Sequence, residues 1–276
     1  MKIGKYNYNR CSQKMPCPVC ERKKYCLVSD DGNFVICTKM PTAKPYKSYS
    51  GWLHSLKNSS YIKPDKVYKT KDYEPNIKII AEVYDRMNLF PDALSELAED
   101  FHVHPSALSD MGVGKHGNSY GFPMRNAQRK ITGIMKRGLN GKKWCIPHSR
   151  VGMYIPRSFN PIFETFVFDG ASDTTVMAYR KYNAIGRFSE SSCVNMIIEL
   201  LAKCPIVTLV PDNDIHGSGY RYAVALAEKL YRSDRKVNIL FNRKHKDTRT
   251  WIDSGTFTEE EFTKLKRRYE PTKEKP

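Results

Sequence analysis

From residue 163 onward, short apolar segments alternate with segments of helical periodicity. The apolar segments that we read as strands are residues 163–168, 184–188, 206–210 and 236–241. The helical segments between them are residues 172–182, 193–203 and 220–232. Strands joined by helices in this order pair in parallel through right-handed crossovers. The pattern therefore predicts an α/β fold whose C-terminal domain is a parallel sheet flanked by helices.

Acidic residues follow two of these predicted strands directly. Asp169 and Asp173 come after the first strand, and Asp212 and Asp214 come after the third. Working residues of parallel sheets gather beyond the carboxyl ends of the strands. We therefore expect these four aspartates to lie together as a catalytic cluster. The alternative is that residues 212–214 are only a turn that caps the next helix.

Four cysteines near the N-terminus have the spacing of a metal site. Cys17 and Cys20 form a C-x-x-C pair, and Cys26 and Cys37 follow it. Four thiolates complete a tetrahedral structural zinc site, and residues 27–37 read as a hairpin with an Asp-Gly turn. The segment 10–40 is therefore predicted to be a zinc ribbon. The alternatives are a disulfide pair or a redox C-x-x-C.

The remaining cysteines are assigned more simply. Cys11 lies close enough in sequence to the four to be a substitute ligand. Cys145, Cys193 and Cys204 are scattered, and we expect them to be ordinary buried residues.

The charge of the chain is large and unevenly distributed. The formal net charge is +17, and Lys and Arg outnumber Asp and Glu by 15 to 6 in residues 1–76 but only by 19 to 16 in residues 159–276. An excess of positive charge concentrated at one end indicates a polyanionic partner, which we expect to be nucleic acid. The alternative is that the charge serves solubility alone.

The middle of the chain is divided by composition. Residues 41–76 are rich in Pro, Ser and Lys and read as a linker. Residues 77–158 read as a helical hairpin followed by a small basic β-rich unit, and residues 256–276 as a charged helix with a frayed tail. Basic residues recur through the β-rich unit at strand-like intervals, and we predict that they bind nucleic acid or nucleotides: Arg125, Lys136, Arg137, Lys142, Lys143 and Arg150.

Two absences from the sequence also shape the expectations. No stretch approaches the ~20 apolar residues of a membrane span, and the first ten residues have no apolar signal core. A soluble, cytoplasmic protein with no membrane partner is therefore expected. No phosphate-binding G-x-x-x-x-G-K-[ST] motif is present, so a helicase partner would be a separate chain.

Three segments in order resemble the motifs of a Toprim domain, which DNA primases, topoisomerases and some nucleases share. They are "FVFDGASDTTVMA", "VTLVPDNDIHGSGYRYAVALAEKL" and "KHKDTRTWIDSG". With the cysteine ribbon in front, the chain is similar to primase-like proteins of phages and mobile elements. The resemblance places the Toprim domain at residues 159–255. The first acidic position of the family is normally Glu, whereas this chain has Asp169.

The resemblance also implies cofactors and partners. Asp169, Asp212 and Asp214 would hold catalytic Mg²⁺ (Mn²⁺ being possible), with Asp173 beside them, and Lys246 would contact nucleic acid or nucleotide. The activity implied is synthesis of RNA primers from nucleoside triphosphates on a single-stranded DNA template. The alternatives are a metal-dependent nuclease and an accessory DNA-binding protein that has lost catalysis. A topoisomerase is disfavoured because the chain is short for a strand-passage gate.

Overall fold

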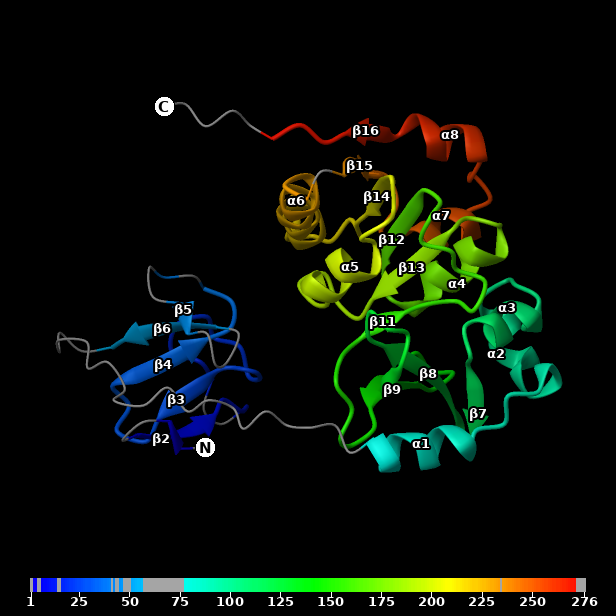
Figure 1. Cartoon of the computed structure of the whole chain (residues 1–276). Helices are drawn as coiled ribbons and strands as arrows, with labels where there is room; N and C mark the ends of the chain where they lie inside the picture. The colour runs from blue at the N-terminus through cyan, green and yellow to red at the C-terminus, as the bar shows by residue number, and fades with distance from the viewer. Residues whose placement is uncertain are drawn as a thin grey trace. The chain divides into compact units, whose positions relative to one another are not determined.

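The chain folds into two compact units, Met1–Glu74 and Pro75–Pro276, which are described separately (Figure 1). The computed structural model describes residues 2–3, 6–13, 16–40, 42, 45–46, 51–56, 77–233 and 235–271. The predicted α/β fold class is confirmed. None of the helices within these ranges is long and apolar enough to cross a membrane.

The described strands of the first unit form a six-stranded antiparallel sheet in the order β1-β2-β3-β4-β6-β5. Their bounds are β1 (Lys2–Ile3), β2 (Tyr6–Arg10), β3 (Leu27–Ser29), β4 (Phe34–Cys37), β5 (Pro45–Tyr46) and β6 (Gly51–Ser55). The predicted hairpin is confirmed as β3 and β4. At its turn the Asp31 carboxylate accepts hydrogen bonds from Ser29 Oγ (2.6 Å) and Asn33 N–H (3.0 Å), and Gly32 takes a φ of +69°, which favours glycine.

The prediction of a linker over residues 41–76 is wrong for its first part. β6 pairs along the whole of β4, from Phe34 opposite Ser55 to Cys37 opposite Trp52. Leu53 of β6 joins the buried core that contains Phe34. The strand has little sequence signal, because it is short and lies among Ser, Lys and Pro residues that are typical of loops. Residues 57–76 of the predicted linker lie outside the described residues.

The described part of the second unit holds a ten-stranded mixed sheet, in the order β10-β9-β8-β11-β13-β12-β14-β15-β16, with β7 paired to β8. Its strands are β7 (Gly114–His116), β8 (Ser119–Arg125), β9 (Ile131–Arg137), β10 (Lys143–Cys145), β11 (Met153–Tyr154), β12 (Thr165–Asp169), β13 (Ala184–Arg187), β14 (Ile206–Val210), β15 (Lys236–Leu240) and β16 (Lys266–Arg268). The four strands predicted from the apolar pattern, β12 to β15, pair in parallel as expected.

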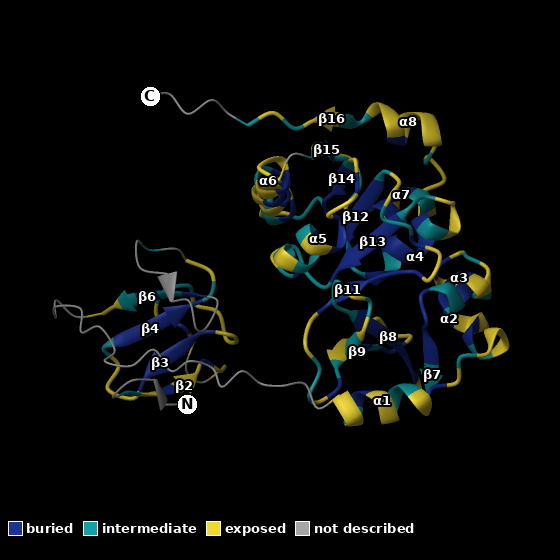
Figure 2. Ribbon diagram, in the orientation of Figure 1, coloured by how far each residue is buried: buried dark blue, intermediate teal, exposed yellow. Residues whose placement is uncertain are grey.

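Helices cover both faces of the parallel strands, whose residues are mostly buried (Figure 2). The helices of this unit are α1 (Ile77–Asp85), the 3₁₀ helix η2 (Pro91–Leu94), α2 (Ser95–Asp100), α3 (Pro105–Asp110), α4 (Ala171–Tyr179), α5 (Val194–Leu200), α6 (Ser218–Tyr231), α7 (Thr248–Asp253) and α8 (Glu259–Lys264). Alternation along β12 separates the two faces, because Val167 joins the core with α5 and α6 while Phe166 and Phe168 join the core with Trp251 and Phe262.

Two further predictions are corrected by this sheet. The basic β-rich unit shares one sheet with the parallel strands, because β11 pairs with both β8 and β13. The C-terminal segment is not a single helix, because α8 ends at Lys264 and β16 then pairs antiparallel with β15. The residues of β16 are Lys and Arg, which are common on the edge strands of sheets. In the sequence they follow the acidic residues of α8, and the whole segment therefore resembles one charged helix.

Candidate functional site

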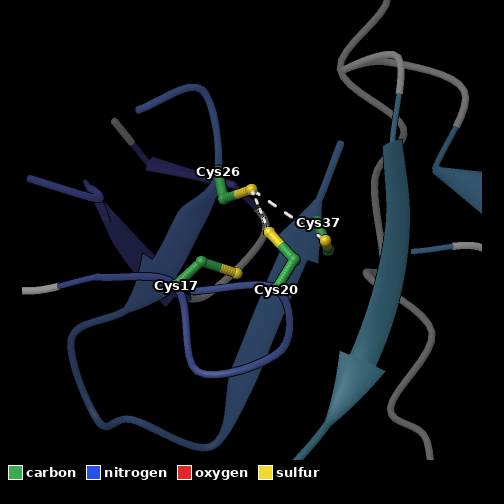
Figure 3. A group of neighbouring side chains, drawn as sticks. All are labelled: Cys17, Cys20, Cys26 and Cys37. Carbon is green, nitrogen blue, oxygen red and sulfur yellow. Dashed lines mark hydrogen bonds between the residues drawn. The ribbon is translucent and has the colours of Figure 1, made fainter. Parts of the chain in front are cut away.

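Four thiols converge in the first unit. Among the described residues, Cys17, Cys20, Cys26 and Cys37 are the group of metal-ligand side chains whose donor atoms all lie within 4.8 Å of one another. Figure 3 shows the four side chains directed toward a common centre. Cys26 Sγ lies 3.7 Å from Cys20 Sγ and 3.9 Å from Cys37 Sγ. This donor set and spacing fit a closed structural zinc site.

The backbone around the thiols is arranged to stabilise thiolates. Thr38 N–H donates to Cys26 Sγ (3.5 Å), and Lys39 N–H and Met40 N–H donate to Cys37 Sγ (3.4 and 3.2 Å). Burial raises the pKa of Cys20 to about 12, so this thiol stays protonated unless a cation compensates its charge.

The other cysteines do not enter the group. All eight cysteines lie in the described ranges and are free thiols, so the disulfide alternative has no support. Cys11 is buried against the cluster, and its N–H donates to the Cys26 carbonyl (2.9 Å), but its thiol is outside the four-membered group.

In the second unit, the carboxyl ends of β12 and β14 bring Asp169 and Asp212 together. The two strands pair in parallel through Phe168 and Val210, and Asp212 N–H donates to Asp169 Oδ2 (3.4 Å). The sequence prediction that the acids of these two strands meet at one edge of the sheet is therefore confirmed for this pair.

Asp169 is already paired with a cation. It lies opposite Arg187 in the β12–β13 register, and the Arg187 guanidinium contacts both carboxylate oxygens. The side chains are 6% and 3% exposed. The Nε and Nη2 atoms of Arg187 make these contacts, whereas its buried Nη1 has no hydrogen-bond partner among the described residues. This ion pair was not foreseen, because the register that opposes the two residues is set by the assembled sheet.

Asp173 and Asp212 have unusual electrostatics. Asp173 is buried in α4 and accepts the Arg249 N–H (2.8 Å); burial, followed by the charge of Asp247, raises its pKa to about 6. Burial, followed by the charges of Asp173, Asp169 and Asp247, raises the pKa of Asp212 to about 8. The Asp212 carboxylate accepts no hydrogen bond from the described residues. Its charged form is therefore the one among these acids that a bound cation would stabilise most.

Asp214 has a different role in the structure. Its carboxylate accepts hydrogen bonds from the N–H groups of His216 (2.9 Å), Ser218 (3.1 Å) and Gly219 (2.6 Å) at the start of α6. Burial acts to raise its pKa, but these hydrogen bonds dominate and lower it to about 2. The turn-and-cap alternative therefore describes Asp214, whereas it does not describe Asp212.

Asp247 is a member of this acidic cluster that the sequence did not predict. Asp247 caps α7 by accepting the Thr250 N–H (2.7 Å), and its charge contributes to the raised pKa values of Asp173 and Asp212. The Asp-Thr-x-Thr pattern before a helix indicates a cap in sequence. Its approach to the other acids depends on the packing of α7 against α4.

The predicted basic residues fall into separate groups rather than one track. Arg137 and Lys143 are opposite each other on β9 and β10, so they share a face of the sheet, while Lys136 is opposite Trp144 on the other face. Arg137 is buried, pairs with Asp100 (2.8 Å) and lies 4.8 Å from the Phe101 ring centroid. It therefore has little freedom to bind phosphate.

Lys143, exposed on β10, is a predicted cation within electrostatic reach of the acids. Desolvation lowers its pKa, as does the charge of Arg137, while Asp173 and Asp212 oppose the shift. Lys246 is also near, since its charge acts to lower the pKa of Asp212 and its carbonyl accepts the Asn213 N–H (2.6 Å).

Arg125, Lys142 and Arg150 are the remaining predicted cations. Arg125 Nη1 donates to the Arg129 carbonyl (3.0 Å). Lys142 and Arg150 are exposed in the segments that flank β10.

The solved structures that resemble the chain include three of primases. The DnaG primase catalytic domain bound to ssDNA has a TM-score of 0.56 at 13% identity, covering 70% of this chain and 78% of that one. The zinc-binding and RNA polymerase domains of the Aquifex aeolicus primase give 0.55 at 13% identity, with 98% and 81% covered. The chain has a primase-like fold. The DnaG catalytic core shares this fold with a TM-score of 0.54 at 12% identity, covering 70% of this chain and 80% of that one. No family model and no curated sequence matches.

Proposed function

We propose that this chain is a primase-like nucleotidyltransferase that makes RNA primers on a single-stranded DNA template with Mg²⁺ at the aspartate cluster. The observation that carries the proposal is Asp212. It is a largely buried carboxylate with no described hydrogen-bond donor, within electrostatic reach of three other aspartates, at the carboxyl edge of a primase-like sheet. Such a group is stabilised by a divalent cation.

The residues at this edge fit Mg²⁺, which is commonly held by one or two carboxylates, with water and substrate phosphates as its other ligands. Asp212 and Asp173 are the carboxylates available for it, and the charge of Asp247 acts on both. Mg²⁺ held by Asp212 and Asp173 would offset the repulsion among the acids and supply Lewis-acid stabilisation of the triphosphate. Lys143 and Lys246 border the cluster and would contact the triphosphate.

The remaining predicted acids are assigned positioning roles. Asp169, neutralised by Arg187, accepts the Asp212 N–H and fixes the start of the acidic loop. Asp214 ties the other end of that loop to α6. Asp169, which is shorter than the Glu expected from the family resemblance, thus forms an ion pair within the sheet. Asp212 is then the aspartate that catalysis requires.

The first unit would bind zinc through its four thiols and engage the template. Its fold supports this assignment because the Aquifex aeolicus structure, named for its zinc-binding and RNA polymerase domains, matches over 98% of this chain. A separate helicase partner and an origin in a phage or mobile element remain proposals from the sequence resemblance.

A nuclease and a non-catalytic accessory protein remain the other candidates. The arginine-paired Asp169 favours the accessory protein, because Arg187 already occupies both of its carboxylate oxygens. Incubation with single-stranded DNA, labelled ribonucleotides and Mg²⁺, followed by a gel, separates the three. Labelled oligomers support the primase, a shortened template the nuclease, and no product the accessory protein.

The assay has a matched pair of variants. Asp212→Asn should abolish product, since the amide cannot hold the cation, whereas Asp92→Asn removes an exposed carboxylate from η2 and should leave product unchanged. Full activity of Asp212→Asn would overturn the assignment of the site.

A further inference from the structure

A cavity separate from the aspartate cluster opens beyond the carboxyl end of β15, the strand next to β14. Its volume is about 790 Å³, and it is bounded by α6, the segment after β15, α7 and the α8–β16 segment. We infer that this cavity binds one nucleotide unit, a base together with its phosphate. The inference does not depend on the catalytic proposal.

The walls of the cavity offer flat aromatic surfaces. Tyr220 and Phe241 lie with ring centroids 4.9 Å apart, and His245 stacks on Trp251 at 5.8 Å with an interplanar angle of 13°. Tyr220 is 42% exposed, so its ring is accessible. Aromatic side chains of this kind stack on bases of any sequence.

The same cavity carries cations without partners. Arg243 and Lys244 are exposed, and their side chains have no hydrogen-bond or ion-pair partner among the residues that the structure describes. Lys264 also lines the cavity, but it is paired with Glu260. Glu261 is the one acid among the described lining residues. Two free cations beside aromatic rings complement a base and its phosphate, and the volume lies within the usual range for small-ligand sites.

The cavity is connected to the acidic loop through Asn213. Asn213 lies between Asp212 and Asp214, and its Nδ2 donates to the Arg243 carbonyl (2.9 Å). A nucleotide held in the cavity is therefore next to the loop that positions Asp212. The occupant is either a free nucleotide or one unit of a single strand, which share this chemistry.

Equilibrium binding of ATP and of a short oligothymidylate to the full chain tests the inference. No Mg²⁺ is added, so the aspartate cluster does not contribute through a bound cation, and no chelator is used, so the zinc site of the first unit stays intact. Tyr220→Ala should weaken binding about tenfold through lost stacking. Tyr222→Ala is its control, because Tyr222 is on the same helix, is 43% exposed and does not line the cavity.

A second pair of variants tests the cations. The double change Arg243→Gln and Lys244→Gln should also weaken binding about tenfold, through lost charged phosphate contacts. The double change Lys229→Gln and Lys236→Gln removes the same charge from exposed positions outside the cavity and should leave binding near wild type. Circular dichroism of all variants verifies their folding.

The two probes separate the sources of the ligand. Weakened ATP binding assigns the cavity to free nucleotides, and weakened oligothymidylate binding alone assigns it to a strand. If wild type binds neither probe at millimolar concentration, or if the cavity variants bind as their controls do, the inference is overturned. Neither result bears on whether Asp212 is catalytic.

Discussion

Removing Arg187 should destabilise the second unit strongly. The Arg187 and Asp169 side chains are 3% and 6% exposed, and the guanidinium contacts both carboxylate oxygens. Arg187→Met would leave the Asp169 carboxylate with only the Asp212 N–H at 3.4 Å. Leaving one partner of a buried ion pair uncompensated typically costs about 3–5 kcal/mol, and we expect a loss of that size in the free energy of unfolding.

A second change distinguishes loss of the charge pair from loss of packing. Adding Asp169→Asn to Arg187→Met removes the uncompensated charge, so the double variant should recover roughly half of the loss or more. Urea unfolding followed by far-ultraviolet circular dichroism measures both, because all described helices lie in Pro75–Pro276. A loss below about 1 kcal/mol for Arg187→Met, or a double variant that recovers nothing, would refute the reasoning.

Three other expectations can be tested on the same protein. Purified protein should contain about one zinc per chain by elemental analysis. Cys17→Ser should lower the zinc content, while the helical circular dichroism of the second unit persists. Full zinc content in Cys17→Ser would contradict the four-thiol site. In EDTA, the pKa values of about 6 for Asp173 and about 8 for Asp212 mean that the folded chain binds more protons than the unfolded chain above about pH 4. The free energy of unfolding, measured in urea titrations, should therefore fall as pH rises from about 4 to about 8. In Asp212→Asn this fall should be smaller. An equal dependence of the free energy of unfolding on pH in that variant would count against the raised pKa of Asp212. Deleting residues 1–76 should weaken single-stranded DNA binding and reduce its salt dependence, since fewer counterions are released; an unchanged slope would assign binding to the second unit.

The sequence predicted those features that depend on local pattern. The thiol cluster followed from spacing around a hairpin, and the parallel strands followed from short apolar runs between helices. The meeting of Asp169 and Asp212 followed from the rule that parallel strands share a carboxyl edge. Each of these needs only residues that are close in sequence or a general rule of topology.

The features that were missed depend on strand register and packing. The Asp169–Arg187 pair requires the register of β12 against β13, and Asp247 joins the acids only when α7 packs on α4. Strands β6 and β16 were missed because a short strand among loop residues and a charged edge strand carry little apolar signal. The division of the basic residues between two faces likewise follows from the pairing of β9 with β10.

The two-residue strand β11 limits how this chain can be shortened for experiments. It is hydrogen-bonded to β8 on one side and to β13 on the other, so the antiparallel strands β7 to β10 and the parallel strands β12 to β15 form one continuous sheet. A fragment cut between β11 and β12 leaves an unpaired backbone edge on each piece, and such edges promote self-association. Recombinant pieces intended to stay monomeric should therefore keep α1 through β16 together.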